Sequence, residues 1–438
     1  MKKNEYSLFT AIAMIVGIVI GSGIFFRSDN ILVATDGSVA LGVLVFVLAA
    51  ISIIFGSLSI SELAARSNRS GGVIGYAEDS SKPVACAFGW FQIFLYFPTL
   101  VAIVAWVAGI YTCMLFGIES TLEIQVLIGF CYMVAIFALN ILSAKLGGYA
   151  QNVSTIIKLI PLIIIAVAGL MYGDPSTFVL SDVTHMKSTS WLAAIAPIAF
   201  SFDGWIVATS IGAEIKDSKK NLPRALVIGP IFILIIYVLY FVGISALVGP
   251  AEIMALGDEH VNVAAISLFG ESGAKVILTF VVISVLGTVN GLVLGGIRLP
   301  QSLAARNMFP MAEKVAAIDP KLGVSKYSAL VFFVVSTFWL IMHYITMGSN
   351  LLPNSDISEI SVCISYATYI YLYVQVIKLK QRGEITSVIK GYVNPIIATL
   401  GSLVILSGSV GSSLFILHAV ICISIGVSAV MFYNKNNA

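Results

Sequence analysis

The sequence contains few charged residues. Only 11% of its 438 residues are Asp, Glu, Lys or Arg, whereas 59% are hydrophobic, and its mean hydropathy is +1.00. Soluble domains of ordinary composition contain about 25% charged residues. Because so apolar a chain would expose too much hydrocarbon to water, the composition excludes a soluble globular protein and predicts an integral membrane protein.

Cysteine and histidine are also scarce, and neither type forms a cluster. The five cysteines fall in or beside apolar runs without the spacing of metal ligands, and the four histidines are scattered. We therefore expect buried thiols, with no disulfides, no metal site and no cofactor. No HExxH spacing and no paired carboxylates occur within an apolar run, which argues against a membrane-embedded enzyme.

Long apolar segments dominate the chain instead. They are about 20 residues long, the length that a helix needs to cross the hydrocarbon core of a bilayer. They lack the alternation of barrel strands, so helices are the spanning elements. We predict an all-α polytopic membrane protein of about 12 transmembrane helices, near residues 8–33, 39–65, 86–116, 122–142, 148–172, 191–214, 222–248, 274–305, 327–346, 357–380, 392–408 and 412–433.

Lys and Arg are nearly absent from one side of this topology. Of the 24 such residues, two (Lys187 and Lys275) fall in outer loops and two (Arg27 and Lys158) within spans, which leaves 20 on the inner side when the N-terminus is inside. Basic residues remain preferentially in the cytoplasm. The bias predicts an even number of spans in a cell (inner or plasma) membrane, with both termini cytoplasmic and no nucleic-acid partner.

Two spans contain residues that interrupt a helix. Gly17, Gly21 and Gly23 lie near the middle of the first span, and each glycine costs roughly 1 kcal/mol relative to alanine. The sixth span contains Asp203 followed by Gly204, and a carboxylate at mid-membrane normally marks function. The alternatives are a close-packing glycine face and an aspartate that only caps a half-helix. A matched pair of breaks favours the midplane site of a transporter.

A broken helix can bind a zwitterion without any ionic side chain. Its free N–H groups and positive dipole end suit a carboxylate, whereas its free C=O groups and negative end suit an ammonium. The two breaks therefore predict a site for an α-amino acid, held by backbone atoms.

At these residues the sequence resembles the amino acid–polyamine–organocation superfamily. Within it the chain is most similar to the L-amino acid transporter branch, which includes bacterial alanine–serine–cysteine and serine–threonine exchangers. The resemblance covers nearly the whole chain and is carried by residues 16–25, 200–205, 219–224 and 287–291, together with Arg298. It implies one transporter domain, residues 1–438, with a LeuT-like core of two inverted five-helix repeats (residues 8–172 and 191–380), two peripheral helices (residues 392–433), and first and sixth helices unwound at mid-membrane.

The resemblance also implies a binding mode. The substrate carboxylate would meet backbone N–H groups at Gly21, Ser22 and Gly23. The ammonium would meet carbonyls at Val19, Phe200, Ser201 and Asp203, beside Gly204, and Phe200 aligns with the aromatic residue that closes over the substrate from outside. We expect apolar volume to set side-chain selectivity, around Val19, Ile20, Ile24, Phe200 and Phe202.

Lys158 lies deep within the fifth span. The alternative is that Lys158 snorkels, with its ammonium at the membrane surface. However, the four-carbon side chain cannot span the roughly 15 Å that ten helical residues rise to the inner end of the span. In the family such a lysine stands where sodium-coupled relatives hold sodium. It would tie carbonyls near Gly17 to a hydroxyl on the eighth span, either Ser284 or Thr288, and this argues against sodium coupling.

Tyr237 and Tyr240 both lie on the seventh span, and the resemblance implies that one of them hydrogen-bonds near the unwound segment. The sequence does not distinguish them.

The expected function is sodium-independent exchange or facilitated transport of small neutral L-amino acids (Ala, Ser, Cys, Thr, Gly) by alternating access in the lipid bilayer. The alternative is proton-coupled or antiport transport of cationic amino acids or polyamines, with Asp203 as counter-ion. A dication requires further carboxylates, and of the remaining span interiors only Asp29 is identified as offering one.

Animal members of the family use a cysteine between the third and fourth helices to pair with a heavy chain. Residues 117–121 contain no cysteine, so we expect no disulfide-linked heavy chain.

Overall fold

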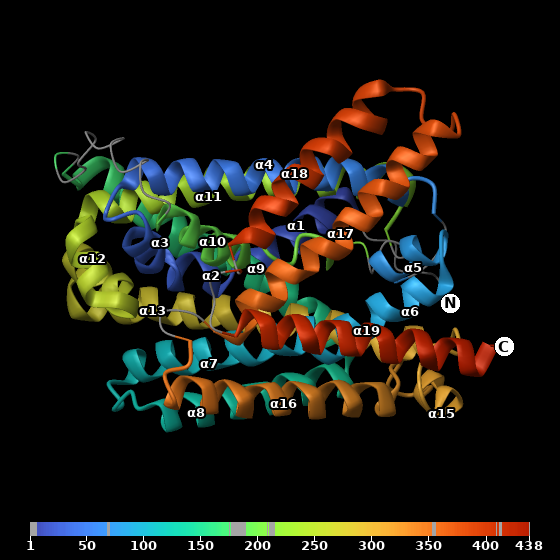
Figure 1. Ribbon diagram of the computed structural model, residues 1–438. Coiled ribbons are helices and arrows are strands. Elements are labelled where there is room, and N and C mark those ends of the chain that lie inside the picture. Colours follow the sequence, from blue (N-terminus) through green and yellow to red (C-terminus); the bar gives the residue numbers. More distant parts are fainter. Residues whose placement is uncertain are drawn as a thin grey trace.

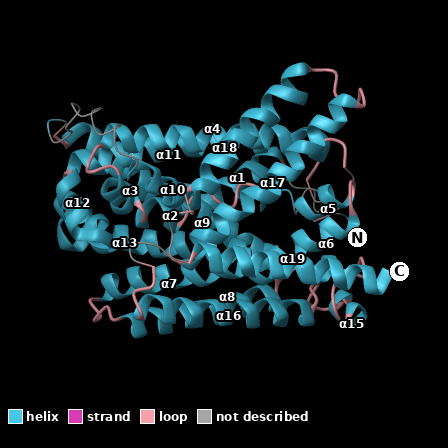
Figure 2. Cartoon of the chain, viewed as in Figure 1, coloured by secondary structure: helices cyan, strands magenta, loops and turns pink. Residues whose placement is uncertain are grey.

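The computed structural model describes residues 7–67, 71–174, 176, 190–207, 209, 215–352, 356–408, 410 and 414–437. Within these ranges the regular structure is helical and contains no strand, as Figure 2 shows. The predicted all-α class is therefore confirmed.

Ten helices of the described chain are long and apolar enough to cross a membrane. They are α4 (Val39–Ala64), α6 to α7 (Lys82–Phe116), α8 (Leu122–Leu142), α9 (Ala144–Tyr172), α11 (Ser218–Val248), the run from α12 to α14 (Pro250–Ala304), α16 (Lys326–Gly348), α17 (Ile357–Gln381), η7 with α18 (Ile389–Ser407) and α19 (Phe415–Asn437).

The first predicted span is a bent series of short helices: α1 (Leu8–Val19), α2 (Ser22–Phe26) and α3 (Ser28–Ala34). Counted as one segment with a bend of 60°, it makes an eleventh candidate span. The sixth predicted span contains the 3₁₀ helix η4 (Ser190–Ala194) and the short α10 (Ile195–Ser201), and part of its remainder lies outside the described residues. The count of twelve therefore stays a prediction.

Two spans contain irregular turns. The third predicted span joins α6 (Lys82–Phe91) to α7 (Phe97–Phe116) through a π-helical turn, η1 (Gln92–Tyr96). The segment before the eighth predicted span is also helical: α12 (Pro250–Leu256) and η6 (Gly257–Glu259) lead into α13 (His260–Gly296), which bends at Gly270, where φ is +66°. Shorter helices α5 (Val73–Glu78), α14 (Leu299–Ala304) and α15 (Ala312–Ala316) lie in connecting segments.

The broken helices lie between two layers (Figure 1). Helices α7, α8 and α16 pack side by side on one side of the molecule, and α4 and α11 pack together on the other. Between these layers α2 contacts α10, and α1 contacts α9, α11 and α13. Both ends of the chain lie at the same end of the molecule (Figure 1). This arrangement encloses the two breaks within protein, where irregular backbone is tolerated at membrane depth.

Close helix packing depends on glycines. An added Cβ at Gly169 of α9 would lie 2.0 Å from the carbonyl oxygen of Gly243 on α11, and an added Cβ at Gly243 would lie 2.8 Å from Ala166. Small residues let transmembrane backbones approach closely, which strengthens van der Waals packing in lipid. The α9–α11 contact therefore requires glycine on both helices.

We predict that Gly169→Ala lowers the melting temperature of the purified protein, because the new methyl group must push two backbones apart; overpacking of this kind costs about 1–3 kcal/mol. Gly148→Ala is the matched control, since it lies on the same helix and its added Cβ meets nothing within 4 Å. Equal melting temperatures for the two variants in thermal unfolding would show that the α9–α11 contact tolerates the methyl group.

Candidate functional site

The first break separates α1 from α2. Helix α1 ends at Val19, helix α2 begins at Ser22, and Gly21 between them has a non-helical backbone with φ of −153° and ψ of −134°. The amide of Ile20 still donates to the carbonyl of Val16, at 2.8 Å. Because the ladder stops there, the carbonyls of the last turn of α1 need other donors.

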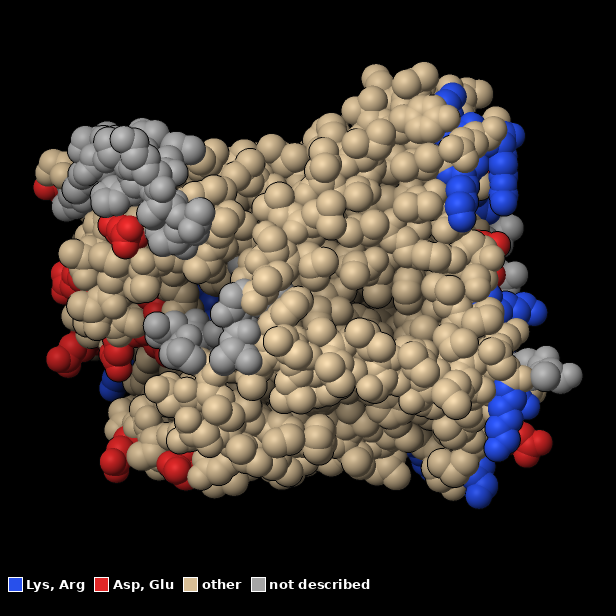
Figure 3. Space-filling model, in the orientation of Figure 1, with Lys and Arg blue, Asp and Glu red and all other residues tan. Residues whose placement is uncertain are grey.

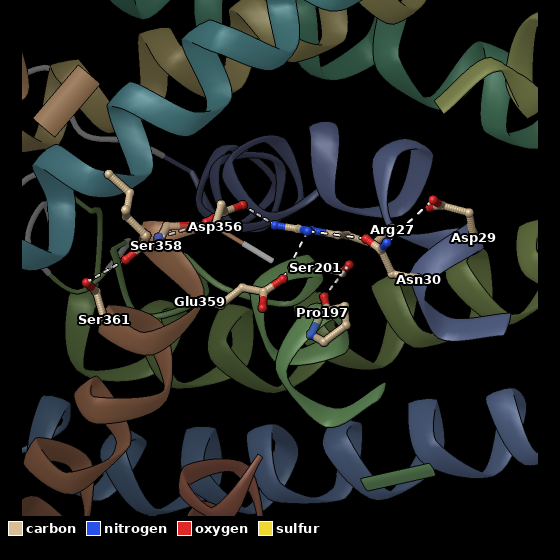
Figure 4. Close-up of polar contacts among 10 residues, drawn as sticks. Arg27, Asp29, Asn30, Pro197, Ser201, Asp356, Ser358, Glu359 and Ser361 are labelled. Carbon is tan, nitrogen blue, oxygen red and sulfur yellow. Dashed lines mark hydrogen bonds and ion pairs between the residues drawn. The ribbon is translucent and has the colours of Figure 1, made fainter. Parts of the chain in front are cut away.

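The second break follows α10. This helix ends at Ser201 and the chain turns through residues 202–206, with Gly204 at φ of +92°, a conformation that glycine adopts without strain. Within the turn the amide of Asp203 donates to the carbonyl of Phe200, at 3.0 Å. The hydroxyl of Ser201 is used inside the helix, where it donates to the carbonyl of Pro197 (Figure 4).

The two breaks face each other across a small cavity. A Cβ added to Gly23 would lie 2.6 Å from the Cα of Ser201, and one added to Gly204 would lie 2.7 Å from Ile18. The cavity between them has a volume of about 20 Å³. A space of this size holds about one water molecule. Its lining residues are Ile18, Val19, Gly21, Gly23, Leu100, Val104, Phe200, Asp203, Gly204, Thr288 and Leu292.

Not every predicted pocket residue lines this cavity. Ile20, Ile24 and Phe202 are buried but are absent from its walls. The ring of Phe202 instead packs on Tyr237, with centroids 5.1 Å apart, and on Phe46, at 6.2 Å. Sequence reasoning could not exclude them, because the directions of neighbouring side chains at a break do not follow helical periodicity.

Tyr237, and not Tyr240, reaches both breaks. Its hydroxyl lies 3.0 Å from the carbonyl oxygen of Val19 and 2.8 Å from that of Ser201, and it can donate its single hydrogen to either. Tyr240 packs edge-on against Phe25, and its hydroxyl has no partner among the described residues. Of the two tyrosines, it is thus Tyr237 whose hydroxyl lies beside the broken segments.

Lys158 supplies a hydrogen-bond donor to a backbone carbonyl in the last turn of α1. Its buried ammonium donates to the carbonyl of Gly17 at 2.5 Å and to the hydroxyl of Thr288 at 3.3 Å. Of the two hydroxyls that the sequence offered, Thr288 is the partner; the hydroxyl of Ser284 has no hydrogen bond within the described chain. Thr288 also approaches the carbonyl of Ile20, at 3.4 Å.

A chain of buried amides reaches the same carbonyl and was missed in the sequence. Asn140 of α8 donates to Asn290 of α13 at 2.8 Å, Asn290 donates to Gln151 of α9 at 3.2 Å, and Gln151 donates to Gly17 at 3.1 Å. The signal was present, since amide side chains within apolar spans need partners. Four helices are thereby joined at the end of α1.

Figure 4 shows a buried ion cluster in which Arg27 meets Asp356 and Glu359. The guanidinium of Arg27, whose side chain is 2% exposed, bonds to Asp356 and, at 2.9 Å, to Glu359. It lies 4.9 Å from the centre of the Phe200 ring. Asp356 is also the N-cap of α17 and accepts from the amide of Ser358 at 2.7 Å. The cluster ties the end of the first span to the start of α17.

The sequence did not reveal this cluster, and the prediction that Asp29 is the only further carboxylate in the span interiors is wrong. Glu359 is buried in the first turn of α17, within the predicted span of residues 357–380. Arg27 offered a signal, because a cation within a span requires a partner. No spacing rule could identify that partner, which lies more than 300 residues away along the chain.

Residues 6–438 match the sequence model of the amino acid permease family. The serine/threonine exchanger SteT of Bacillus subtilis is 30% identical over 87% of this chain and 84% of its own length. The b(0,+)-type amino acid transporter 1 of Homo sapiens is 28% identical over 66% of this chain, which spans 60% of that relative. The large neutral amino acids transporter small subunit 2 of Mus musculus is 27% identical over 78% of this chain and 67% of its own.

The fold also has a counterpart among solved structures. MhsT in complex with L-phenylalanine matches 93% of this chain and 100% of its own, with a TM-score of 0.63 and 16% sequence identity. This likeness confirms the predicted LeuT-like fold.

We predict that Arg27→Ala strongly destabilises the protein, because it leaves two buried carboxylates without their cation; breaking a buried pair costs about 3–5 kcal/mol. Lys326→Ala is the control, since its ion pair with Asp319 is at the surface and the Lys326 side chain is 62% exposed. Thermal unfolding in detergent compares the two. A melting temperature for Arg27→Ala as high as that of Lys326→Ala would contradict the structural importance of the cluster.

Proposed function

The chain belongs to the amino acid permease family, and from this premise we propose that it is a secondary transporter that exchanges small neutral L-amino acids by alternating access, without sodium. The observation that carries the proposal is the pair of facing helix breaks, whose residues line one small cavity. Its relatives are transporters rather than enzymes.

Backbone atoms bind both charged groups of the substrate in this proposal. The first amides of α2, at Gly21, Ser22 and Gly23, have no intrahelical acceptor and meet the carboxylate. The ammonium meets the carbonyls of Val19, Phe200, Ser201 and Asp203. The hydroxyl of Tyr237 now lies against two of these carbonyls, so an ammonium there would take over its hydrogen bonds.

The size and lining of the cavity favour small side chains. Apart from Asp203 and Thr288, its walls are backbone and apolar groups. Even the smallest amino acid requires more than the present volume of about 20 Å³, so transport includes an expansion of this site. Each added methylene of a substrate would require further displacement of packed helices, which is costly.

Exchange is supported by the relative SteT, whose name describes a serine/threonine exchanger. Sodium independence is supported by Lys158. Its ammonium already occupies the carbonyl of Gly17 and approaches Thr288, oxygen atoms of the kind that a hard cation would need as ligands. A second cation beside a buried ammonium would also be repelled.

The ion cluster at Arg27 is the outer closure in this mechanism. It places a guanidinium on Phe200, an element of the cavity wall, and joins the first span to α17. Opening the site outwards would require this contact to separate, and its two carboxylates to meet water.

The distribution of charge supports an orientation in the cell membrane with both termini in the cytoplasm. In Figure 3 most visible Lys and Arg gather at the end that carries both termini, and most visible Asp and Glu lie at the opposite end. Basic residues are retained on the cytoplasmic side. We expect no disulfide-linked heavy chain, because the loop of residues 117–121 contains no cysteine.

The proposal is tested by uptake of radiolabelled serine into liposomes that contain the purified protein. We expect uptake to be fast when unlabelled serine, alanine or threonine is inside, slow when the liposomes are empty, and unchanged when choline replaces sodium. Equal uptake into empty and loaded liposomes would refute exchange, whereas a strict sodium requirement would refute the role of Lys158.

We predict that Lys158→Ala slows exchange or changes substrate affinity on one membrane face more than on the other. Hydrogen bonds to a charged group contribute about 1.5–3 kcal/mol each, so a contact present in one state only would shift populations by more than tenfold. Arginine should not restore the rate, because its planar fork does not fit a point-charge site.

The measurement is the Michaelis constant for serine on the inner and outer faces of oriented liposomes. Lys378→Ala serves as control, because Lys378 is an exposed lysine at the end of α17, remote in sequence from both breaks. Unchanged rate and unchanged sidedness in Lys158→Ala would leave the lysine as a tolerated buried charge.

A further inference from the structure

Asp203 is a buried carboxylate without a cation. It lines the central cavity and is 7% exposed. Among the residues that the structure describes, no Lys, Arg or His forms an ion pair with it. An uncompensated carboxylate at this depth is expensive, so its neighbours should show how it is stabilised.

Tyr96 caps both oxygens of this carboxylate. Its hydroxyl lies 2.7 Å from Oδ1 and 2.6 Å from Oδ2 of Asp203. The ring is fixed by Phe91, stacked with centroids 6.0 Å apart, and by Phe97, edge-on at 5.2 Å. Tyr96 is the last residue of the π-helical turn η1, and such turns are frequent at functional sites because they redirect side chains out of helical register.

The surroundings of the capped carboxylate have the chemistry of a cation receptor. Trp205 and Tyr369 pack edge-on at 5.7 Å, and Tyr369 packs on Tyr366 at 5.2 Å. Both tyrosines lie on α17, which packs against α10, the helix that leads into the turn holding Asp203. Tyr366 Oη and Trp205 Nε1 are buried and have no hydrogen-bond partner within the described chain. Aromatic faces around a carboxylate attract ammonium and guanidinium groups.

We propose that Tyr96 is a specificity-determining residue that excludes cationic amino acids by capping Asp203. With the hydroxyl in place, the carboxylate accepts a hydrogen bond from a neutral donor. Without the hydroxyl, the buried carboxylate lacks its donor, and a cationic substrate side chain can replace it. The inference deepens the proposed function, since it concerns the side-chain selectivity of the same site.

Discrimination follows from the cost of unpaired buried groups. In the capped site, a cationic side chain would lose its hydration and would have to compete with the Tyr96 hydroxyl for the carboxylate, whereas a hydroxyl or methyl group loses little. In the uncapped site the balance reverses, because a neutral substrate leaves the carboxylate without its donor. The identity of residue 96 therefore decides which class of substrate is favoured.

The test compares two amino acids of equal length, homoserine and 2,4-diaminobutyrate, which differ by a hydroxyl or an ammonium at the end of the side chain. Each is used to inhibit exchange of labelled serine by the full-length protein in liposomes. In the wild type we expect homoserine to inhibit at lower concentration. In Tyr96→Phe the ratio of inhibitory concentrations should shift towards diaminobutyrate by roughly tenfold or more, as expected for one lost hydrogen bond to a charged group.

Two further variants make the test specific. Tyr96→Phe combined with Asp203→Asn should lose the shift, because no carboxylate remains to receive the cation. Tyr111→Phe is the matched control: Tyr111 is buried on α7, its hydroxyl has no partner in the described chain, and it does not line the cavity. We expect its ratio to equal that of the wild type.

Stabilisation of each variant by the same two amino acids, measured by thermal unfolding in detergent, gives a second readout that does not require transport. A wild-type preference for diaminobutyrate, or an unchanged ratio in Tyr96→Phe, would overturn the proposal in either assay. If the wild type did not exchange serine at all, the proposed function would fail, while the two binding ratios would still decide the role of Tyr96.

Discussion

The structure depends on one constraint: a helix that breaks inside a membrane releases backbone groups that only the protein can satisfy. The breaks after Val19 and Ser201 release carbonyls, and the donors that reach them come from other helices. Lys158 and Gln151 of α9 donate to Gly17, and Tyr237 of α11 reaches the carbonyls of both breaks. Side chains from neighbouring spans therefore supply hydrogen bonds that the broken helices cannot make within themselves.

These donors couple the site to the rest of the fold. In a continuous helix the carbonyls at mid-membrane accept from amides of the same helix, so its position does not depend on hydrogen bonds from neighbouring helices. A broken helix is held by a few hydrogen bonds to α9, α11 and α13, each of which depends on where those helices stand. The donors that stabilise the breaks in the membrane therefore also make the position of α1 sensitive to the packing of the surrounding helices. Alternating access requires such sensitivity.

The sequence predicted the features whose presence in a membrane is costly. Gly21, Gly23, Asp203 and Lys158 were identified because glycines and charges within a span need a reason. It could not choose Tyr237 over Tyr240 or Thr288 over Ser284, because residues three or four apart share a helix face and only packing sets which one meets a partner. The sequence could not predict the pairing of Arg27 with Asp356 and Glu359, because this pairing arises from tertiary structure.

The buried charges of the core differ in how they are balanced. Arg27 has two carboxylates, whereas Lys158 and Asp203 form no ion pair with each other or with any other described residue, and each is stabilised by neutral dipoles. A zwitterion has no net charge, so its binding leaves the net charge of the core unchanged. A cationic substrate would add a net charge, and Asp203, the carboxylate that lines the cavity, already accepts a hydrogen bond from Tyr96. The proposed selectivity for neutral substrates would thus rest on charge balance in a low-dielectric site as much as on its volume.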